Sequence, residues 1–262
     1  TNIALNITQV LNKWLTVGMG TQAIQKEFGG EQPYLEAGLK MSPYGIYKDE
    51  NDRYVDYPMD QTLFYNPMAN IDATNDKTNR NVFISTFAEI QFPIDGLSFR
   101  TNFGLDYTNY YSYRMSKKSP EFSEDMGQNN FEEHSDYNYR WVWTNTLTYN
   151  KTFNDVHKLT VLLGTEAIRD GLGREITGRR YKYLYEDNTN TWELDMGENN
   201  NQRLVNSGYK GEFALFGIFG RVDYSYADKY LFTGIIRRDG VSRFSESNRY
   251  GVFPSVSFGW RL

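Results

Sequence analysis

The sequence predicts an all-β protein, with one antiparallel sheet of the kind that forms a transmembrane β-barrel. Three observations predict it. Stretches that alternate apolar and polar residues recur along the chain. Aromatic residues make up 16% of the chain and gather near the ends of these stretches. The connections between them alternate between short polar turns and long segments rich in Gly, Asn, Asp and Tyr.

The alternation is clearest in residues 97–110, 137–150 and 252–262. In the first of these, Leu, Phe and Tyr fall on one face and Ser, Arg, Asn, Asp and Thr on the other, which is the period of two of a strand. Weaker alternation occurs at 2–11, 14–21, 81–92, 158–168, 209–226 and 230–238. Together these stretches predict about nine strands.

The connections fall into two classes. Short polar turns are expected at Asn12-Lys13 and at residues 93–96, 154–157 and 227–229. Long outer loops are expected near 28–79, 114–134, 171–207 and 240–250. Such asymmetry is typical of a transmembrane barrel, whose strands need ~9–11 residues where a soluble strand needs only ~5–6. We therefore interpret 1–262 as one domain of transmembrane β-barrel strands, which the resemblance described below implies is a partial barrel.

Composition narrows the function classes. A net charge of −5 and a pI near 5.2 argue against a nucleic-acid surface, which needs clustered Lys and Arg. The absence of cysteine excludes disulfides and thiolate sites. A mean hydropathy of −0.66 resembles that of a soluble protein, and alternating strands explain it because they carry as many polar as apolar side chains. No spanning helix and no signal peptide is expected.

The alternation assigns side chains to two faces. We expect Arg100, Asn102, Asp106, Arg140 and Thr144 on an inner, polar face. The lipid face is expected to carry apolar and aromatic side chains: Phe99, Leu105, Trp141, Trp143 and Phe258. Substitution of Phe99 by Asp should then block assembly, and Asn102→Asp should not.

The stretch 237–249 is the sharpest motif. In one interpretation Arg237, Arg238, Asp239 and Arg243 form a charge network on the lumen side that positions loops or a plug, because charges inside a membrane pair with one another or face a lumen. In the other, the stretch is a solvated turn in which Gly240 supplies a positive φ. A structural network is favoured over direct substrate contact, with Arg100, Asp106 and Arg140 as further members.

Other motifs give weaker evidence about function. Residues 18–23, "GMGTQA", match a dinucleotide fingerprint, but no βαβ units follow. Residues 186–201 hold enough oxygen atoms for calcium but lack EF-hand spacing, so an exposed polar loop is favoured and no cofactor is predicted. Trp192, with Tyr181 and Tyr183, is a candidate for stacking on substrate, although Trp192 fits equally well beneath the loop. No convergent catalytic group is found, and the protein is predicted not to be an enzyme.

The C-terminal block "FGRVDYSYADKYLFTGIIRRDGVSRFSESNRYGVFPSVSFGWRL" resembles SusC/RagA-type TonB-dependent outer-membrane transporters. The matching motifs are the turn "ADKYL", then "RRDGVSRF", "NRYG" and "FPSVSFGWR". Upstream, Asn66-Pro67 and the stretches 78–107 and 143–167 look like earlier strands of the same family. The resemblance spans nearly the whole chain.

This resemblance implies a barrel of roughly 22 strands around an N-terminal plug in the bacterial outer membrane. It implies import of oligosaccharides or peptides, delivered by a SusD-like surface lipoprotein and energised by the TonB complex through the plug. Neither plug nor closing strand is recognisable here, so the chain looks like an internal piece. An open sheet of this kind has two unpaired edges and is not expected to span lipid alone.

Two other functions remain open at this point. A stand-alone β protein that binds glycans with its aromatic loops would fold in water without detergent. A β-sandwich hydrolase would need a catalytic constellation that the sequence does not reveal.

Overall fold

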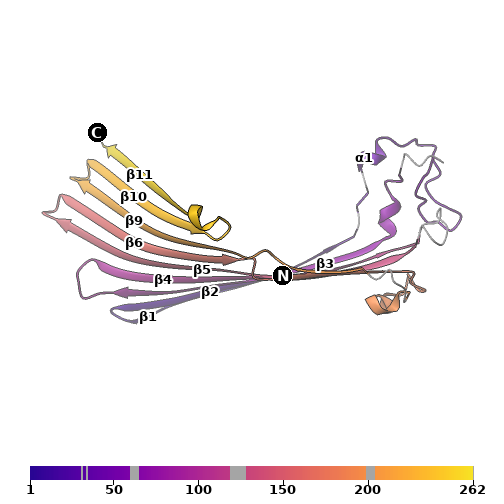
Figure 1. Ribbon diagram of the computed structural model, residues 1–262, viewed down its shortest axis with the longest axis horizontal. Coiled ribbons are helices and arrows are strands. Elements are labelled where there is room, and N and C mark those ends of the chain that lie inside the picture. The colour runs from indigo at the N-terminus through magenta and orange to yellow at the C-terminus, as the bar shows by residue number, and fades with distance from the viewer. Residues whose placement is uncertain (31, 34, 60–64, 119–127, 199–203, 262) are drawn as a thin grey trace.

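The computed structural model describes residues 1–30, 32–33, 35–59, 65–118, 128–198 and 204–261. Nine strands follow one another across a continuous antiparallel sheet, which we call the wall (Figure 1). They are β1 (Asn2–Asn12), β2 (Leu15–Gly29), β3 (Thr74–Gln91), β4 (Leu97–Ser116), β5 (Asn130–Phe153), β6 (His157–Asp170), β9 (Phe213–Tyr226), β10 (Tyr230–Val241) and β11 (Tyr250–Trp260). The predicted all-β antiparallel fold is confirmed.

Tight turns join the strands at the end of the wall that lies on the left of Figure 1. Asn154 and Asp155 have φ values of 50° and 60°, and Ala227 and Asp228 have 51° and 55°. Two consecutive positive φ values are the signature of a type I′ turn, whose twist matches that of the flanking strands. The hairpins therefore lie where the short polar turns predict them.

The other end of the wall differs from the sequence-based expectation. The range 171–207, expected as a loop, contains β7 (Arg174–Tyr181) and the start of β8 (Leu204–Tyr209). The first part of β5 pairs with β7, and β7 with β8, which brings the sheet to 11 strands. β4 and β10 also continue beyond their predicted ends. The apolar and polar alternation is weak in these parts, because polar side chains occupy both faces of β7, as Arg174 and Glu175 show.

Helical structure is minor in the described ranges. Leu35–Gly38 form one short α-helix, α1, and Ala69–Asp72 form the 3₁₀ helix η1. Three further 3₁₀ turns are η2 (Thr189–Thr191), η3 (Leu194–Met196) and η4 (Glu246–Asn248). Across the same ranges, no helix has the length and apolar character needed to cross a membrane.

The register places like side chains opposite one another. Leu105 faces Trp141 and Phe103 faces Trp143, whereas Asn102 faces Thr144. Residues directly opposite each other share a face. The side of the wall that carries Phe103 and Trp143 is called the apolar face, and the side that carries Asn102 is called the polar face. Strands β9 to β11 add further side chains to the apolar face: Phe216, Ile218, Val222, Tyr224, Phe232, Ile236, Val256 and Phe258.

Buried apolar side chains lie outside the wall. We call the described parts of residues 30–76, 108–138 and 171–211 the outer extension; it occupies the right of Figure 1. Met115, Phe131 and Tyr183, which are 1%, 2% and 5% exposed, form a small core there. In the wall, large apolar side chains such as Phe258 remain 72% exposed.

Candidate functional site

The polar face carries a charge cluster that spans three strands. Arg237 of β10 donates from Nε to Asp239 Oδ1 over 2.7 Å, and its Nη2 lies 2.7 Å from Glu166 Oε1 of β6. Between them, β9 presents Gly217, where a Cβ atom would lie 2.3 Å from Asp239 Oδ1. Glycine thus leaves the space in which the cluster lies flat on the sheet. We call Glu166, Arg237 and Asp239 the arginine cluster.

The structure separates two residues that the sequence grouped with this cluster. Arg238 points to the apolar face, because it lies opposite Ile218 and Val252, and its guanidinium carbon is 4.4 Å from the centroid of the Tyr250 ring. Arg243 packs on a different ring, 4.6 Å from the centroid of Phe213. The proposed four-residue network is therefore wrong for Arg238 and Arg243. Consecutive strand residues point to opposite faces, so Arg237 and Arg238 have no shared site.

Gly240 also differs from expectation. It lies inside β10 and is not among the glycines with positive φ. A Cβ atom there would lie 2.4 Å from the ring of Tyr250. The turn interpretation of Arg237 to Gly240 is thus wrong, and Gly240 instead provides space for an aromatic ring on the apolar face.

The other predicted members of the polar face have separate partners. Arg100 lies 3.0 Å from Glu89 Oε2 and donates over 3.0 Å to Asn102 Oδ1. Asp106 accepts a hydrogen bond of 2.6 Å from Asn81 Nδ2. On β5, the Nε atom of Arg140 lies 3.9 Å from Asp170 Oδ2. The polar face therefore holds a series of small charge-paired groups in place of one network.

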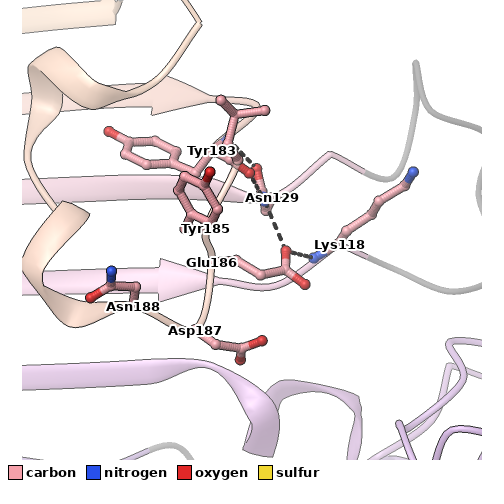
Figure 2. Close-up of a pocket in the computed structure, with 8 residues that line it drawn as sticks. Lys118, Asn129, Tyr183, Tyr185, Glu186, Asp187 and Asn188 are labelled. Atoms are coloured by element: carbon pink, nitrogen blue, oxygen red, sulfur yellow. Dashed lines mark hydrogen bonds between the residues drawn. The ribbon is translucent and has the colours of Figure 1, made fainter.

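A pocket of about 560 Å³ opens on the outer extension, lined by Lys118, Asn129 and residues 183–188 (Figure 2). Asn129 organises it. Its Nδ2 donates over 2.8 Å to the Tyr183 carbonyl and over 2.8 Å to Glu186 Oε2, and its Oδ1 accepts from the Tyr183 amide. The Lys118 amide also donates to Glu186 Oε2, over 3.0 Å. A carboxylate is thereby fixed beside an exposed ring, Tyr185.

The three aromatic residues predicted to contact substrate occupy other roles. Tyr183 is 5% exposed, and its hydroxyl donates over 2.8 Å to the Glu193 carbonyl. Burial raises the pKa of this hydroxyl to about 12. Trp192 packs against the same core and donates from Nε1 to the Glu186 carbonyl, so it lies beneath the loop. Tyr181 ends β7 opposite Asn130 and does not line the pocket. Tyr183 is therefore corrected from a contact residue to a core residue.

The sequence reasoning missed Tyr185, Asn129 and Lys118. Tyr183 and Tyr185 stand in the same short run, and nothing in their spacing shows which ring is buried. Part of the segment 186–201, for which the sequence predicts an exposed polar loop in preference to a calcium loop, lies outside the described residues, at 199–201. Among the described residues there is no group of three or more His, Asp or Glu side chains placed to hold a metal ion.

The comparisons with known proteins agree with the barrel-like geometry of the wall. No family model matches the chain. The chain is 29% identical over 270 residues to TonB-dependent receptor P39 of Formosa agariphila, which covers 98% of this chain and 24% of the receptor. It is 27% identical over 204 residues to TonB-dependent receptor SusC of Bacteroides thetaiotaomicron, covering 75% of this chain and 18% of SusC. The chain is similar to part of a SusC-type TonB-dependent receptor.

Solved structures agree on the fold. The structure of the RagAB peptide transporter superposes with a TM-score of 0.77 at 22% identity, over 97% of this chain and 29% of that one. The RagAB peptide importer in its open-open state gives the same TM-score at 23% identity, over the same shares of the two chains. The resemblance read from the sequence motifs is thus confirmed. The chain spans about a quarter of the length of two curated receptors that it matches over 98% and 100% of its own length; the shares of those receptors are 24% and 26%.

Proposed function

We propose that this chain forms part of the barrel wall of a TonB-dependent outer-membrane importer that takes up oligosaccharides or peptides. The main support for this proposal is that the wall has one apolar face and one polar face. Its apolar face would contact lipid, and its polar face, lined by charge-paired groups such as the arginine cluster, would face the lumen and a plug. The similarity to SusC and to RagAB supports both the membrane and the class of cargo.

Two bands of aromatic rings on the apolar face support the membrane assignment. Near the tight turns, Tyr226 stacks with Tyr230 at 6.3 Å between ring centroids, and His157 lies 5.0 Å from Tyr226. Beside the outer extension, Tyr107 and Tyr139 face each other with 4.8 Å between their ring centroids. Aromatic girdles of this kind mark the two interfaces of a membrane barrel. A stand-alone glycan-binding protein in water would leave this entire face exposed, which disfavours that alternative.

The outer pocket is the proposed contact for cargo or for a SusD-like lipoprotein. A fixed carboxylate, Glu186, accepts hydrogen bonds from hydroxyl or amide groups, and the exposed ring of Tyr185 offers a flat apolar surface beside it. Both are properties that oligosaccharides and peptides require from a binding site. Energy from TonB would reach the cargo through a plug, as the family resemblance of the sequence implies.

Growth on defined nutrients tests the proposal. A bacterial strain that lacks the full-length receptor would be complemented with the wild type, Phe103→Asp or Asn102→Asp, and grown on oligosaccharide or peptide mixtures as sole carbon source. Phe103→Asp should abolish growth and remove the receptor from outer-membrane fractions, because a carboxylate would enter the hydrocarbon region. Asn102→Asp keeps an acceptor for Arg100 Nε and should support growth.

Fractionation separates the alternatives. An antibody against residues 221–244 should detect a band far above 30.6 kDa in outer membranes. A water-soluble species at that mass, with equal growth of both variants, would contradict the importer and favour the glycan-binding protein.

A further inference from the structure

A groove of about 310 Å³ lies on the wall where β5, β6, β9 and β10 approach the outer extension. The side chains that matter for its chemistry are Trp141, Phe216 and Tyr250, which are aromatic, and Arg169 and Arg249, which are cationic. Trp141, Phe216 and Tyr250 all belong to the apolar face by register. The groove therefore combines an apolar floor with cations on the side expected to contact lipid.

Two arginines at this groove lack acidic partners among the described residues. Arg249 lines it, and its Nε atom is buried without any hydrogen-bond acceptor. Arg238 stacks on Tyr250, a lining residue, and forms no ion pair in the described ranges. Arg169 differs, since it is paired with Glu212. Arg237, the neighbour of Arg238, contacts two carboxylates on the opposite face of the sheet. Acidic side chains therefore occur in this part of the sheet, but these two lie on the polar face and not beside Arg238.

The position of Arg238 along its strand matches a membrane interface. It lies 8 residues after Tyr230, which belongs to the aromatic band near the tight turns. At about 3.3 Å per residue this is roughly 26 Å of strand, or about 20 Å across the membrane for a strand tilted by ~40°. An apolar band of about 25 Å separates the two interfaces of a barrel. The Arg238 backbone thus lies about 5 Å short of the outer edge of this band, and the long arginine side chain spans that gap to the headgroup level. Phe232 and Ile236 cover the hydrocarbon below it.

We propose that this groove binds the phosphate group of an anionic outer-leaflet lipid, held by Arg238 and Arg249, with the lipid's acyl chains against Phe216 and the neighbouring apolar face. A guanidinium stacked on a ring keeps its N–H groups at its edge, where they bind phosphate oxygens in pairs. A phosphorylated glycolipid with several acyl chains fits both the charge and the apolar floor.

This inference rests on the assignment of the apolar face to lipid, which is part of the proposed function, but not on cargo or import. The test therefore uses binding and not transport. The purified full-length receptor in detergent would be titrated with lipid A that carries two phosphates, and separately with the same lipid after both phosphates are removed. Native mass spectrometry would count bound lipids. We expect at least a tenfold preference of the wild type for the phosphorylated lipid.

Variants localise the site. Arg238→Gln with Arg249→Gln should reduce that preference to less than twofold. Lys229→Gln, which removes a cation stacked on Trp260 at the opposite end of the wall, is the matched control and should keep the preference. Heat-modifiable migration on gels would confirm that each variant is a folded barrel. Inorganic phosphate at millimolar concentration should not displace the lipid, because it lacks acyl chains.

Three outcomes would overturn the proposal. The first is equal binding of both lipids by the wild type, which can be established without any variant. The second is complete displacement of the lipid by inorganic phosphate, which would identify a site for free anions. The third is a dimer of the receptor that Arg238→Gln abolishes, which would assign the groove to a second copy of the chain. If growth on nutrients failed while the lipid preference persisted, the proposed cargo would be wrong and the lipid site would stand.

Discussion

The wall and the outer extension share strands β4 and β5, yet they place their apolar side chains in opposite environments. In the outer extension, Phe131 and Met115 are almost completely buried against protein. In the wall, Val256 and Phe258 are 71% and 72% exposed on a continuous apolar surface. Strands β4 and β5 thus run from the outer extension, which has a small apolar core, into the wall, whose apolar side chains stay exposed.

If lipid covers the apolar face, as we propose, the difference reflects two solvents acting on one sheet. The outer extension buries apolar groups in the manner of a water-soluble protein, with buried polar atoms such as Asn129 fully bonded. In the wall, the backbone ladder satisfies the peptide groups, and lipid would cover the apolar face. Stability in the first part would then come from side-chain packing, and in the second from backbone pairing together with the bilayer.

The largest expected effect is on the outer extension. Phe131→Ala should cost about 3–5 kcal/mol, because it empties the centre of the small core. Trypsin should then cleave near Arg179 and Arg180 in the native receptor, while heat-modifiable migration shows that the barrel remains assembled. Leu184→Ala, at a side chain that is 89% exposed, is the control and should not change cleavage. Loss of the barrel together with the extension would mean that the two parts are one cooperative unit.

The wall should respond to charge on one face only. Val256→Arg places a guanidinium on the apolar face near the middle of β11 and should destabilise the receptor in lipid bilayers by about 2–4 kcal/mol. Its neighbour Ser257 lies on the polar face opposite Thr233, which donates to Asp223. Ser257→Arg should therefore be tolerated. Chemical denaturation in vesicles compares the two variants, and equal losses would contradict the assignment of the faces.

A smaller effect is expected within the arginine cluster. Arg237→Met leaves Glu166 and Asp239 close together without their cation and should cost about 1–2 kcal/mol. Arg238→Met, on the other face, should change the free energy of unfolding by less than about 0.5 kcal/mol. The double variant Arg237→Met with Glu166→Gln should recover part of the first loss. Additive losses in this cycle would show that the two side chains do not interact.

The smallest effect is expected at the tight turns. Lys158 Nζ lies 2.7 Å from Asp228 Oδ2, and the hydrogen bond from Lys158 is the main cause that lowers the pKa of the Asp228 carboxyl. A lowered pKa in the folded state stabilises the fold above the unfolded value near 3.9, and this contribution is lost as the pH falls through the folded value. NMR titration should show the Asp228 pKa rising toward 3.9 in Lys158→Met. An unchanged pKa would exclude the pairing in solution.

The sequence by itself determined the wall. Alternation with a period of two fixed the strands, their faces and the tight turns, because a half-buried strand must present one kind of side chain to each side. The motifs from Ala227 to Arg261 were specific enough to identify the family resemblance. The same period of two places Arg237 and Arg238 on opposite faces. The prediction of one charge network overlooked this, because it grouped residues that are neighbours along the chain.

Tertiary structure alone decided the outer extension and its pocket. Strands β7 and β8 pair in water, where both faces carry polar groups and no alternation marks them. Which ring is buried, Tyr183 or Tyr185, depends on contacts with Phe131 and Asn129, more than 50 residues away along the chain. The groove near Tyr250 is likewise lined by Gly240 of β10 and Trp141 of β5, which are separated by β6 and β9 in the sheet. Local patterns record the solvent on each face, whereas such sites arise from contacts between distant segments.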